Sequence, residues 1–488
     1  MTARSWEPVI GLEIHVQLAT RTKMFCGCRL SFGEPPNTYT CPVCLGHPGA
    51  LPVTNREAVR LGIVIGLALG CEIAAESVFH RKNYFYPDLP KAYQISQYDH
   101  PLCSSGAFTV LEGDGSERVV RITRAHLEED AGKLLHLGEG GRRAGAVASV
   151  VDFNRGGTPL VEIVTEPDIR SPDEAVTFLK QLRQTFQHLG VSDCSMEEGS
   201  LRVDANVSVR PEGTEELGTK TELKNMNSFT FLRRGIEAEI ARQVELLESG
   251  RRVVQETLHF DPEAGTLHAL RSKEEAHDYR YFPEPDLVPI VPSREWVEDI
   301  RAGLPELPVA RRRRWSRDWG LTFEDAEVLS ETPELAAYFE EAAACSGEPK
   351  AAANLIRNEL VALLRERGEQ AWRSRVTPER LAGVVELLRA RTISMPVAKE
   401  VLAEVATTGA DPAAVVEERG LAQIADTDRL RSIVQGVLDA HPVQAAELRG
   451  GKDKLVGFFV GQVMKATEGR ADPAAVGGLV RDLVRAFG

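Results

Sequence analysis

Potential ligand side chains alternate with apolar residues near the start of the chain. Residues 10–18 read Ile-Gly-Leu-Glu-Ile-His-Val-Gln-Leu. Successive side chains of a β-strand point to opposite faces, so this pattern places Glu13, His15 and Gln17 on one face. A carboxylate beside an imidazole on rigid backbone is typical of a metal site. We therefore take Glu13 and His15 as candidate metal ligands.

Two later segments supply further carboxylates. One reads His-Leu-Glu-Glu-Asp and contains Glu128 and Glu129, and in the other Glu162 is the only charged residue of an apolar stretch. We predict one divalent cation bound by Glu129 and Glu162 together with the two residues above, because carboxylate oxygens are the ligands that magnesium prefers. A one-residue error in strand register would exchange the two faces, so Glu128 remains an alternative to Glu129.

Three basic residues, Arg202, Lys224 and Arg280, offer donors suited to phosphate. Acids that hold magnesium, combined with cations that hold phosphate, indicate ATP-dependent phosphoryl transfer. The chain contains neither a Walker A sequence nor a G-x-G-x-x-G loop, so we expect ATP to bind on the sheet and its metals. Taken alone, the alternating segments around Arg202 and Lys224 are more simply explained as the solvated face of a half-exposed sheet.

Four of the eight cysteines form two close pairs, Cys26 with Cys28 and Cys41 with Cys44. Such pairs can close a tetrahedral thiolate site, and we predict a structural Zn²⁺ ion there. The alternative is four free thiols in a reducing compartment. The other cysteines are expected to be small buried side chains rather than nucleophiles. They are Cys71, Cys103, Cys194 and Cys345.

The composition is that of an ordinary globular protein, with 488 residues, 43% hydrophobic residues and a formal net charge of -14. The negative charge argues against nonspecific binding of polyanions, which depends on Lys and Arg. Residues 1–9 lack the apolar core of a signal peptide, and the longest apolar run, 61–71, is too short to span a bilayer. We expect a cytoplasmic protein in which residues 61–71 form a buried helix.

The periodicity of hydrophobic residues changes twice along the sequence, which predicts an α+β fold followed by helical domains. Residues 1–295 are rich in period-two segments typical of antiparallel sheet with interspersed helices. Residues 296–409 show helical spacing, for example with Thr377 as an N-cap and Pro378 at the first helical position. A turn-rich break precedes a small α-helical tail domain at 410–488.

Three further segments carry specific expectations. Residues 82–97 and 278–286 are aromatic and punctuated by proline, and we expect ordered functional loops rather than ordinary helices or strands. The alternative is that both are packed structural loops. The basic run at 311–314 is expected to be a solvated helix face.

Eight segments together closely resemble the B-subunit (GatB) family of tRNA-dependent amidotransferases, which act on misacylated Glu-tRNA(Gln) or Asp-tRNA(Asn). They are GLEIHVQL, KNYFYPDLPKAYQISQ, RAHLEEDAGK, TPLVEIVTEPD, EEGSLRVDANVSVR, ELKNMNSF, KEEAHDYRYFPEPDL and GFFVGQVMK. The resemblance extends from residue 9 to near the C-terminus.

The resemblance implies a cradle-like antiparallel-sheet domain similar to glutamine synthetase, followed by a helical domain and a tail that contacts tRNA. In this family the cradle uses ATP and Mg²⁺ to phosphorylate the side-chain carboxylate of the residue esterified to tRNA. Ammonia then displaces phosphate and gives the amide. Activation is necessary because a carboxylate is a poor acyl electrophile, and Mg²⁺ neutralises the charge that accumulates.

The resemblance also assigns residues by motif. The family's divalent-metal positions correspond to Glu13, His15, Glu129 and Glu162. Lys82 and Lys91 fall in the motif associated with the ammonia path, and the four clustered cysteines match a zinc knuckle that some members carry.

Partners follow from what the chain lacks. No segment has the character of a glutaminase, so ammonia is expected from the family's separate amidase subunit, and a further small subunit would make the complex a heterotrimer. Misacylated tRNA(Gln) or tRNA(Asn) is the expected substrate, and the cognate nondiscriminating synthetase is a further candidate partner. Two alternatives are a noncatalytic zinc-containing tRNA-binding scaffold and a free-standing ligase for a small carboxylate. A noncatalytic scaffold would not need the predicted metal ligands Glu13, His15, Glu129 and Glu162. A ligase for a small carboxylate would not need the helical domains.

Overall fold

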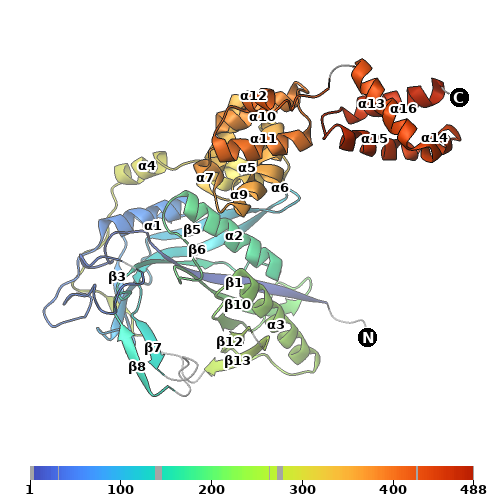
Figure 1. Cartoon of the computed structure of the whole chain (residues 1–488). Coiled ribbons are helices and arrows are strands. Elements are labelled where there is room, and N and C mark those ends of the chain that lie inside the picture. Colours follow the sequence, from blue (N-terminus) through green and yellow to red (C-terminus); the bar gives the residue numbers. More distant parts are fainter. Residues whose placement is uncertain are drawn as a thin grey trace. The chain divides into compact units, whose positions relative to one another are not determined.

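The computed structural model describes residues 5–30, 32–137, 146–262, 264–271, 279–424 and 427–486. Chain contacts divide it into two compact units, Met1–Arg311 and Arg312–Gly488. The first combines a large sheet with helices, and the described part of the second contains helices only (Figure 1). A sheet domain followed by helical sequence is therefore confirmed, whereas the predicted boundaries near 295 and 409 remain predictions.

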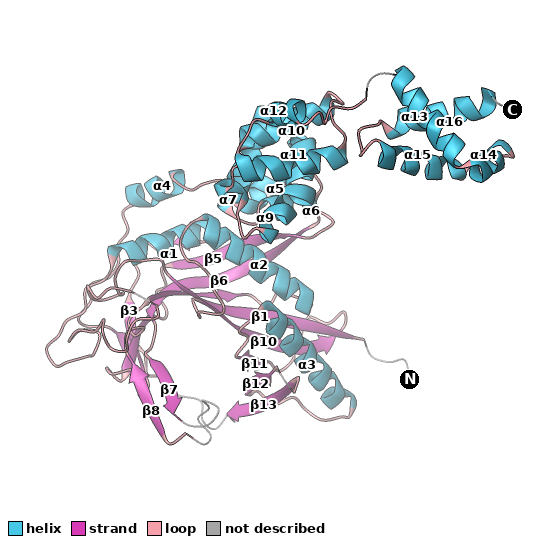
Figure 2. Ribbon diagram, viewed as in Figure 1, coloured by secondary structure: helices cyan, strands magenta, loops and turns pink. Residues whose placement is uncertain are grey.

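The described residues of the first unit contain three sheets, together with helices (Figure 2). The largest has nine strands in the order β13-β12-β11-β10-β1-β9-β6-β5-β2, and the smaller ones have the orders β14-β3-β4 and β7-β8. The strands are β1 (Trp6–Gln17), β2 (Glu72–Ile73), β3 (Phe79–Asn83), β4 (Tyr93–Gln97), β5 (Cys103–Leu111), β6 (Glu117–Glu129), β7 (Lys133–Leu137), β8 (Ala148–Asp152), β9 (Pro159–Thr165), β10 (Leu201–Pro211), β11 (Thr221–Lys224), β12 (Thr257–Asp261), β13 (Thr266–Arg271) and β14 (Phe282–Pro283). Within these described strands only β11 and β12 pair in parallel.

Helices cover one face of the large sheet (Figure 2). They are α1 (Arg56–Ala68), α2 (Pro172–His188) and α3 (Phe229–Glu248), while α4 (Arg294–Ala302) packs against α1. The alternation of β10 explains this layering, because Leu201, Val203 and Ala205 are buried toward the helices while Arg202 and Asp204 are only half-buried on the other face. Each fully buried Val or Leu contributes about 1.5–3 kcal/mol to the layer.

Helix α1 confirms the buried helix expected in the apolar run. Asn55 caps it by accepting hydrogen bonds from the backbone N–H groups of Glu57 and Ala58. The helix stops at Ala68, before the end of the run, and Cys71 directly precedes β2. Gly66 allows the helix to approach β5 closely, since a Cβ atom there would lie 2.4 Å from Sγ of Cys103.

An irregularity in β6 sets the register of its second half. The pairing with β9 shifts between Ile122 and Arg124. Buried residues accordingly change phase, from Val120 and Ile122 before the shift to Ala125 and Leu127 after it. Such a β-bulge places one extra residue in one strand and exchanges the faces beyond it.

Two separate hydrophobic cores are found among the described residues of the second unit, one spanning residues 315–416 and the other residues 430–483. Its helices, together with α5 at the junction of the units, are α5 (Pro308–Trp319), α6 (Phe323–Leu329), α7 (Pro333–Ser346), α8 (Pro349–Leu355), α9 (Val361–Glu366), α10 (Pro378–Arg389), α11 (Met395–Thr408), α12 (Pro412–Glu418), α13 (Thr427–Ala440), α14 (Pro442–Arg449), α15 (Leu455–Ala466) and α16 (Pro473–Ala486). A π-helical turn (Ile356–Leu360) and a 3-10 turn (Ala371–Arg373) complete it. Thr377 caps α10 by accepting from the N–H of Arg380, with Pro378 in the first turn, as predicted.

Several local expectations are wrong. Arg312, predicted to lie on a solvated face, is only 2% exposed, because its guanidinium donates to Oγ of Ser330 inside the helical unit. Cys345 is exposed near the end of α7, whereas the other three scattered cysteines are buried as expected. Residues 82–97 are not all loop, since their ends belong to the paired strands β3 and β4.

The second aromatic segment is described from residue 279 onward, and its first residue lies outside the described residues together with part of the KEEAHDYRYFPEPDL motif. Phe282 and Pro283 form strand β14 rather than a loop. Among the described residues, no helix combines the length and apolar character required to traverse a membrane.

Candidate active site

A row of functional side chains crosses four adjacent strands of the large sheet. Strand register pairs His126 of β6 with Glu162 of β9, Glu162 with His15 of β1, and His15 with Arg202 of β10. Directly opposed residues of neighbouring strands share a face, so these four side chains lie side by side. Glu13 belongs to the same face, two residues before His15, as the alternation predicted.

The centre of this row is Glu162. Its Oε2 lies 3.4 Å from Nε2 of His15 and 3.5 Å from Nε2 of His126. Glu128 also reaches the site, with its Oε1 3.6 Å from Nε2 of His15. Ligand atoms of Glu13, His15 and Glu162 lie within 4.8 Å of one another, as do those of His126, Glu128 and Glu162. This donor set of carboxylates and imidazoles fits a divalent cation.

Burial and charge separate the two imidazoles. Burial lowers the pKa of His126 to about 4, so this ring is neutral near pH 7. Burial also opposes protonation of His15, but Glu162 and Glu128 outweigh it and raise the pKa of His15 to about 9. A proton therefore occupies His15 when no metal is bound.

The two carboxylates also differ. Burial raises the pKa of Glu128 to about 7. Burial opposes ionisation of Glu162 as well, yet the flanking imidazoles of His126 and His15 hold the pKa of its carboxyl below the usual range. Glu162 is thus the fixed negative charge of the site, and Glu128 is poised to gain or lose a proton near neutrality.

The structure does not bring Glu129 into this set. It follows Glu128 on β6 and faces the opposite side, where Lys91 forms an ion pair with it and the N–H of Ile95 donates to its Oε1 at 3.0 Å. The prediction that Glu129 shares a face with Glu162 is therefore wrong, and the alternative residue, Glu128, occupies that position. The cause is the register of β6 beyond its bulge, which places His126 and Glu128 together.

Two of the three predicted phosphate donors, Arg202 and Lys224, have acidic partners in the structure. Arg202 contacts Asp130 at 3.1 Å, and Gln17 donates to the same carboxylate at 3.0 Å. Nζ of Lys224 lies 2.7 Å from Asp204 and 2.8 Å from Glu222. These contacts hold both cations on the site face of the sheet.

The remaining predicted residues, Lys82, Lys91 and Arg280, differ in their position relative to the carboxylates around Glu162. Lys82 lies near the acids, and although burial opposes protonation, Glu128 raises the pKa of Lys82. Its Nζ also stands 4.9 Å from the centroid of the Tyr279 ring. Arg280 is exposed and has a φ of 43°. The structure therefore groups Lys82 with the carboxylates and places Lys91 on the other side of β6.

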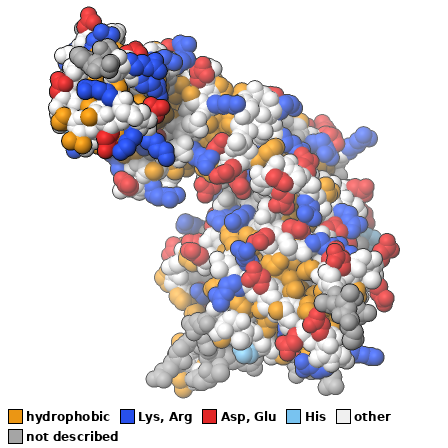
Figure 3. All heavy atoms as spheres, turned by 90° about the vertical axis from the view of Figure 1, so that its right-hand side faces the viewer, with side chains coloured by type: hydrophobic (Ala, Val, Ile, Leu, Met, Phe, Trp, Pro, Cys, Tyr) orange, Lys and Arg blue, Asp and Glu red, His pale blue; other side chains and the backbone are white. Residues whose placement is uncertain are grey.

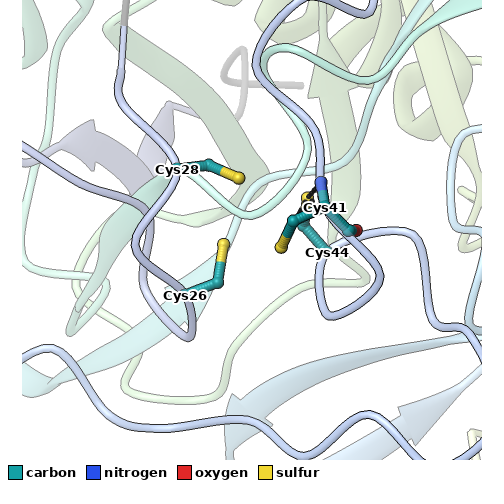
Figure 4. Close-up of side chains that lie close together, drawn as sticks. All are labelled: Cys26, Cys28, Cys41 and Cys44. Atoms are coloured by element: carbon teal, nitrogen blue, oxygen red, sulfur yellow. Dashed lines mark hydrogen bonds between the residues drawn. The ribbon is translucent and has the colours of Figure 1, made fainter.

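The four clustered cysteines converge, as Figure 4 shows, with their sulfur atoms directed toward a common point. Their Sγ atoms lie within 4.8 Å of one another, and the Sγ atoms of Cys41 and Cys44 are 3.9 Å apart. Sulfur atoms of a tetrahedral Zn(Cys)4 site are separated by roughly 3.8 Å, given a Zn–S distance of about 2.3 Å. The N–H of Cys41 donates to Sγ of Cys44 at 3.2 Å. The arrangement therefore fits a tetrathiolate metal site.

The thiols of the cluster differ in their pKa values. A hydrogen bond with Cys26 lowers the pKa of Cys44 to about 4, against the effect of burial. Burial raises the pKa of Cys28 to about 11. Cys28 must therefore lose its proton when a metal ion binds.

Sequence reasoning missed three site residues, His126, Asp130 and Asp204. His126 lies two residues before Glu128, so period-two alternation would have found it once Glu128 was preferred. Asp204 faces Glu13 directly across β10 and β1, and this pairing could not be foreseen without the strand order. Asp130 follows the end of β6, where no periodicity applies.

Comparison with known proteins places this chain in a defined class. Residues 8–298 match the family described as the GatB/GatE catalytic domain, and residues 337–484 match the family described as the GatB domain. The relatives include aspartyl/glutamyl-tRNA(Asn/Gln) amidotransferase subunits B of three bacteria. The protein of Carboxydothermus hydrogenoformans is 53% identical over 98% of this chain and 99% of its own length. That of Geotalea daltonii is 54% identical over 97% and 98%, and that of Geobacter sulfurreducens is 53% identical over 98% of each chain. The chain belongs to the family of aspartyl/glutamyl-tRNA(Asn/Gln) amidotransferase B subunits.

Proposed function

We propose that this protein is the subunit of a glutamine-dependent aminoacyl-tRNA amidotransferase that activates and amidates the amino acid carried by tRNA. It converts Glu-tRNA(Gln), Asp-tRNA(Asn) or both into the corresponding amides, as an ATP-dependent carbon–nitrogen ligase in the cytoplasm. The family membership over nearly the whole chain supports the reaction. The observation that carries the site is the row in which Glu162 stands between His15 and His126.

The metal ligands of the proposed site are Glu13, His15, Glu128 and Glu162. Oxygen-rich ligation suits Mg²⁺, which would neutralise the phosphates of ATP and the charge that develops during phosphoryl transfer. Glu129 is kept in the proposal as the ion-pair partner of Lys91 rather than as a ligand. The structural Zn²⁺ ion is assigned to the four clustered cysteines.

The cations around the metal ligands have separate proposed roles. Arg202, Lys224 and Arg280 are proposed to contact the nucleotide. The first two must then exchange acidic partners for phosphate, and those acidic partners balance their charge until the nucleotide binds. Lys82 and Lys91 are proposed to line the path of ammonia, on the two sides of β6. The similarity of the sheet to that of glutamine synthetase is likewise a proposal.

Ammonia is proposed to come from a separate amidase subunit, and one more small subunit is proposed to complete a heterotrimer. The substrate tRNA is proposed to contact the C-terminal helices α13–α16, with the cognate nondiscriminating synthetase as a further partner. Lysine and arginine side chains are spread over the surface of the C-terminal helices in Figure 3. Lys454 and Lys465 are exposed there, in a protein whose net charge is -14.

The test is ATP-dependent conversion of Glu-tRNA(Gln) to Gln-tRNA(Gln) by the heterotrimer reconstituted with candidate amidase and small subunits, with ammonium as nitrogen donor. Wild type should form product, and Glu162→Gln should lose activity while still binding tRNA. The matched control Glu215→Gln changes an exposed carboxylate in the loop after β10 and should stay active. Wild type that binds tRNA without forming product would favour the noncatalytic scaffold, and an active Glu162→Gln enzyme would remove this residue from the catalytic site.

A further inference from the structure

Lys23 is an unusual residue of the first unit because its long charged side chain is completely buried. Its exposed fraction is 0%, and it is among the largest side chains hidden from solvent. A buried ammonium is costly unless it is paired and hydrogen-bonded. The partners of Lys23 therefore indicate what it does.

The Nζ atom of Lys23 has two acceptors. It donates to the carbonyl oxygen of Phe153 at 2.9 Å and to Sγ of Cys44 at 3.6 Å. Within the part of the chain that the structure describes, no carboxylate forms an ion pair with it. Of the two acceptors, only the sulfur of Cys44 can carry a full negative charge.

The backbone fixes Lys23 in this position. Its N–H donates to the carbonyl of Cys28 at 3.0 Å, and its own carbonyl accepts from Nδ2 of Asn55. Gly157 has a φ of +86°, and a Cβ atom there would lie 3.4 Å from Cδ of Lys23 and 3.8 Å from Cβ of Cys44. The aliphatic part of Lys23 therefore packs closely beside Gly157 and Cys44.

A tetrathiolate centre needs such a charge. Four thiolates around one Zn²⁺ ion leave an excess of about two negative charges. In a partly buried site this excess is stabilised by nearby donors and cations, and residues that contact metal ligands in this way commonly change metal affinity by about 10- to 100-fold. Lys23 contacts one ligand directly, and its ammonium is buried beside the cluster.

We propose that Lys23 is the counter-charge of the tetrathiolate centre and couples its metal affinity to the stability of the surrounding fold. This inference rests on the structural Zn²⁺ ion proposed above. Lys23 is a positioning residue and not a ligand. Its charge stabilises the metal-loaded centre, whose net charge is negative, more than it stabilises the metal-free cluster, where protons neutralise part of the sulfur charge. Removal of the charge should therefore destabilise the loaded form more than the metal-free form.

The test uses Lys23→Met, which keeps a long apolar side chain and removes the charge. Lys133→Met, which changes an exposed lysine of β7, is the matched control. Metal-free full-length proteins are titrated with Co²⁺, whose absorption reports the number of thiolate ligands, and Zn²⁺ affinity is measured by competition with a chelator. Thermal unfolding is followed for the metal-free and loaded forms of each protein.

Lys23→Met is expected to bind Zn²⁺ about 10- to 100-fold more weakly with the Co²⁺ spectrum still that of four thiolates. Its loaded form should unfold at a lower temperature than loaded wild type, whereas the unfolding temperature of its metal-free form should change by less. Unchanged affinity in Lys23→Met would overturn the role of Lys23, while wild type that binds no Co²⁺ would overturn the zinc proposal instead.

A second pair of variants decides the matter if Lys23→Met does not fold. Lys23→Arg keeps the charge and can extend into the adjoining cavity of about 200 Å³, which Lys23 and Cys44 both line. Lys23→Gln keeps a hydrogen-bond donor without the charge. The proposal requires the Arg variant to retain metal affinity closer to wild type than the Gln variant, and equal affinities of the two would contradict it.

Discussion

Glu162 and His15 face each other across strands β9 and β1, with the carboxylate oxygen 3.4 Å from the imidazole nitrogen. Without a metal ion this contact is an ion pair, because Glu162 is held ionised and the pKa of His15 is raised to about 9. A metal ligand must present a lone pair, so a cation that binds here has to displace the proton of His15. Protons therefore balance the charge of the clustered carboxylates until a metal ion replaces them.

Metal binding should consequently become stronger as pH rises. Below pH 7 both Glu128, with a pKa of about 7, and His15, with a pKa of about 9, must lose protons, and between pH 7 and 9 mainly His15 must do so. Each released proton strengthens binding by up to about tenfold per pH unit. Isothermal titration with Mn²⁺ from pH 6 to 9, in buffers of different ionisation enthalpy, measures both affinity and proton release. Affinity independent of pH would contradict the protonated state assigned to His15.

Neighbouring glutamates on β6 should behave differently on substitution. Glu128→Gln removes a carboxylate that lies 3.6 Å from His15, so we expect Mn²⁺ binding to weaken by at least about tenfold. Glu129→Gln should leave Mn²⁺ affinity unchanged, because its side chain pairs with Lys91 on the other face. Electron paramagnetic resonance of free Mn²⁺ distinguishes the two. The reverse order of effects would show that the register of β6 is misassigned.

Loss of one clustered cysteine should remove the bound zinc. Cys44→Ser deletes a ligand, and we expect metal content to fall from about one Zn²⁺ per chain to near zero. Because metal binding and local folding are coupled, the thermal midpoint should also fall, by roughly 2–4 °C for each kcal/mol lost. Cys345→Ser is the control, since that thiol is exposed and outside the cluster. Elemental analysis showing full zinc in Cys44→Ser would exclude this site.

Two glycine-to-alanine substitutions should have opposite effects on stability. In Gly66→Ala the new Cβ atom would lie 2.4 Å from Sγ of Cys103, so α1 or β5 must shift and the protein should lose about 1–3 kcal/mol. Gly436 lies in helix α13 with open space around its Cβ position. There the substitution should gain about 0.5–1 kcal/mol from helix propensity. Urea unfolding measures both, and a stable Gly66→Ala protein would refute the close packing of α1.

Charge reversal on the C-terminal helices should weaken tRNA binding. Lys454→Glu combined with Lys465→Glu should raise the apparent KM for aminoacyl-tRNA and flatten its dependence on salt, since contacts to phosphate are the salt-sensitive ones. Lys350→Glu, at an exposed lysine of α8, is the matched control. The KM is measured in the reconstituted heterotrimer at several salt concentrations. An unchanged KM in the double variant would remove these lysines from the tRNA contact.

Much of this fold could be predicted from local patterns. The alternation in β1 and β10 identified the faces of both strands, and the cap at Thr377 marked the start of α10, because these signals depend on neighbouring residues alone. The cysteine spacing identified the cluster for the same reason. The buried Arg312 could not be foreseen, since its partner Ser330 is supplied by a different part of the helical unit.

The incorrect prediction of Glu129 instead of Glu128 as a metal ligand has a different cause. Periodicity along one strand gives two possible faces, and only pairing with a neighbouring strand decides between them. In β6 the shift between Ile122 and Arg124 makes this decision. No residue within 126–130 reports that shift, so the sequence of the site itself was insufficient.

That shift means that chain length, as much as residue identity, encodes the chemistry of the site. Thr123 lies at the irregularity, and its hydroxyl donates to Glu166 at 2.7 Å. Deleting Thr123 itself would remove the irregularity and leave His126 opposite Glu162, because Ile122 already faces Thr165 and Arg124 already faces Val164. Deleting Ala125 instead, with the pairing before it retained, would bring Leu127 opposite Glu162 and turn His126 toward the helices, although every site residue was still present. The number of residues between the shift and His126 therefore determines which side chain faces Glu162, whereas the turn at 112–116 precedes both the strand and the shift.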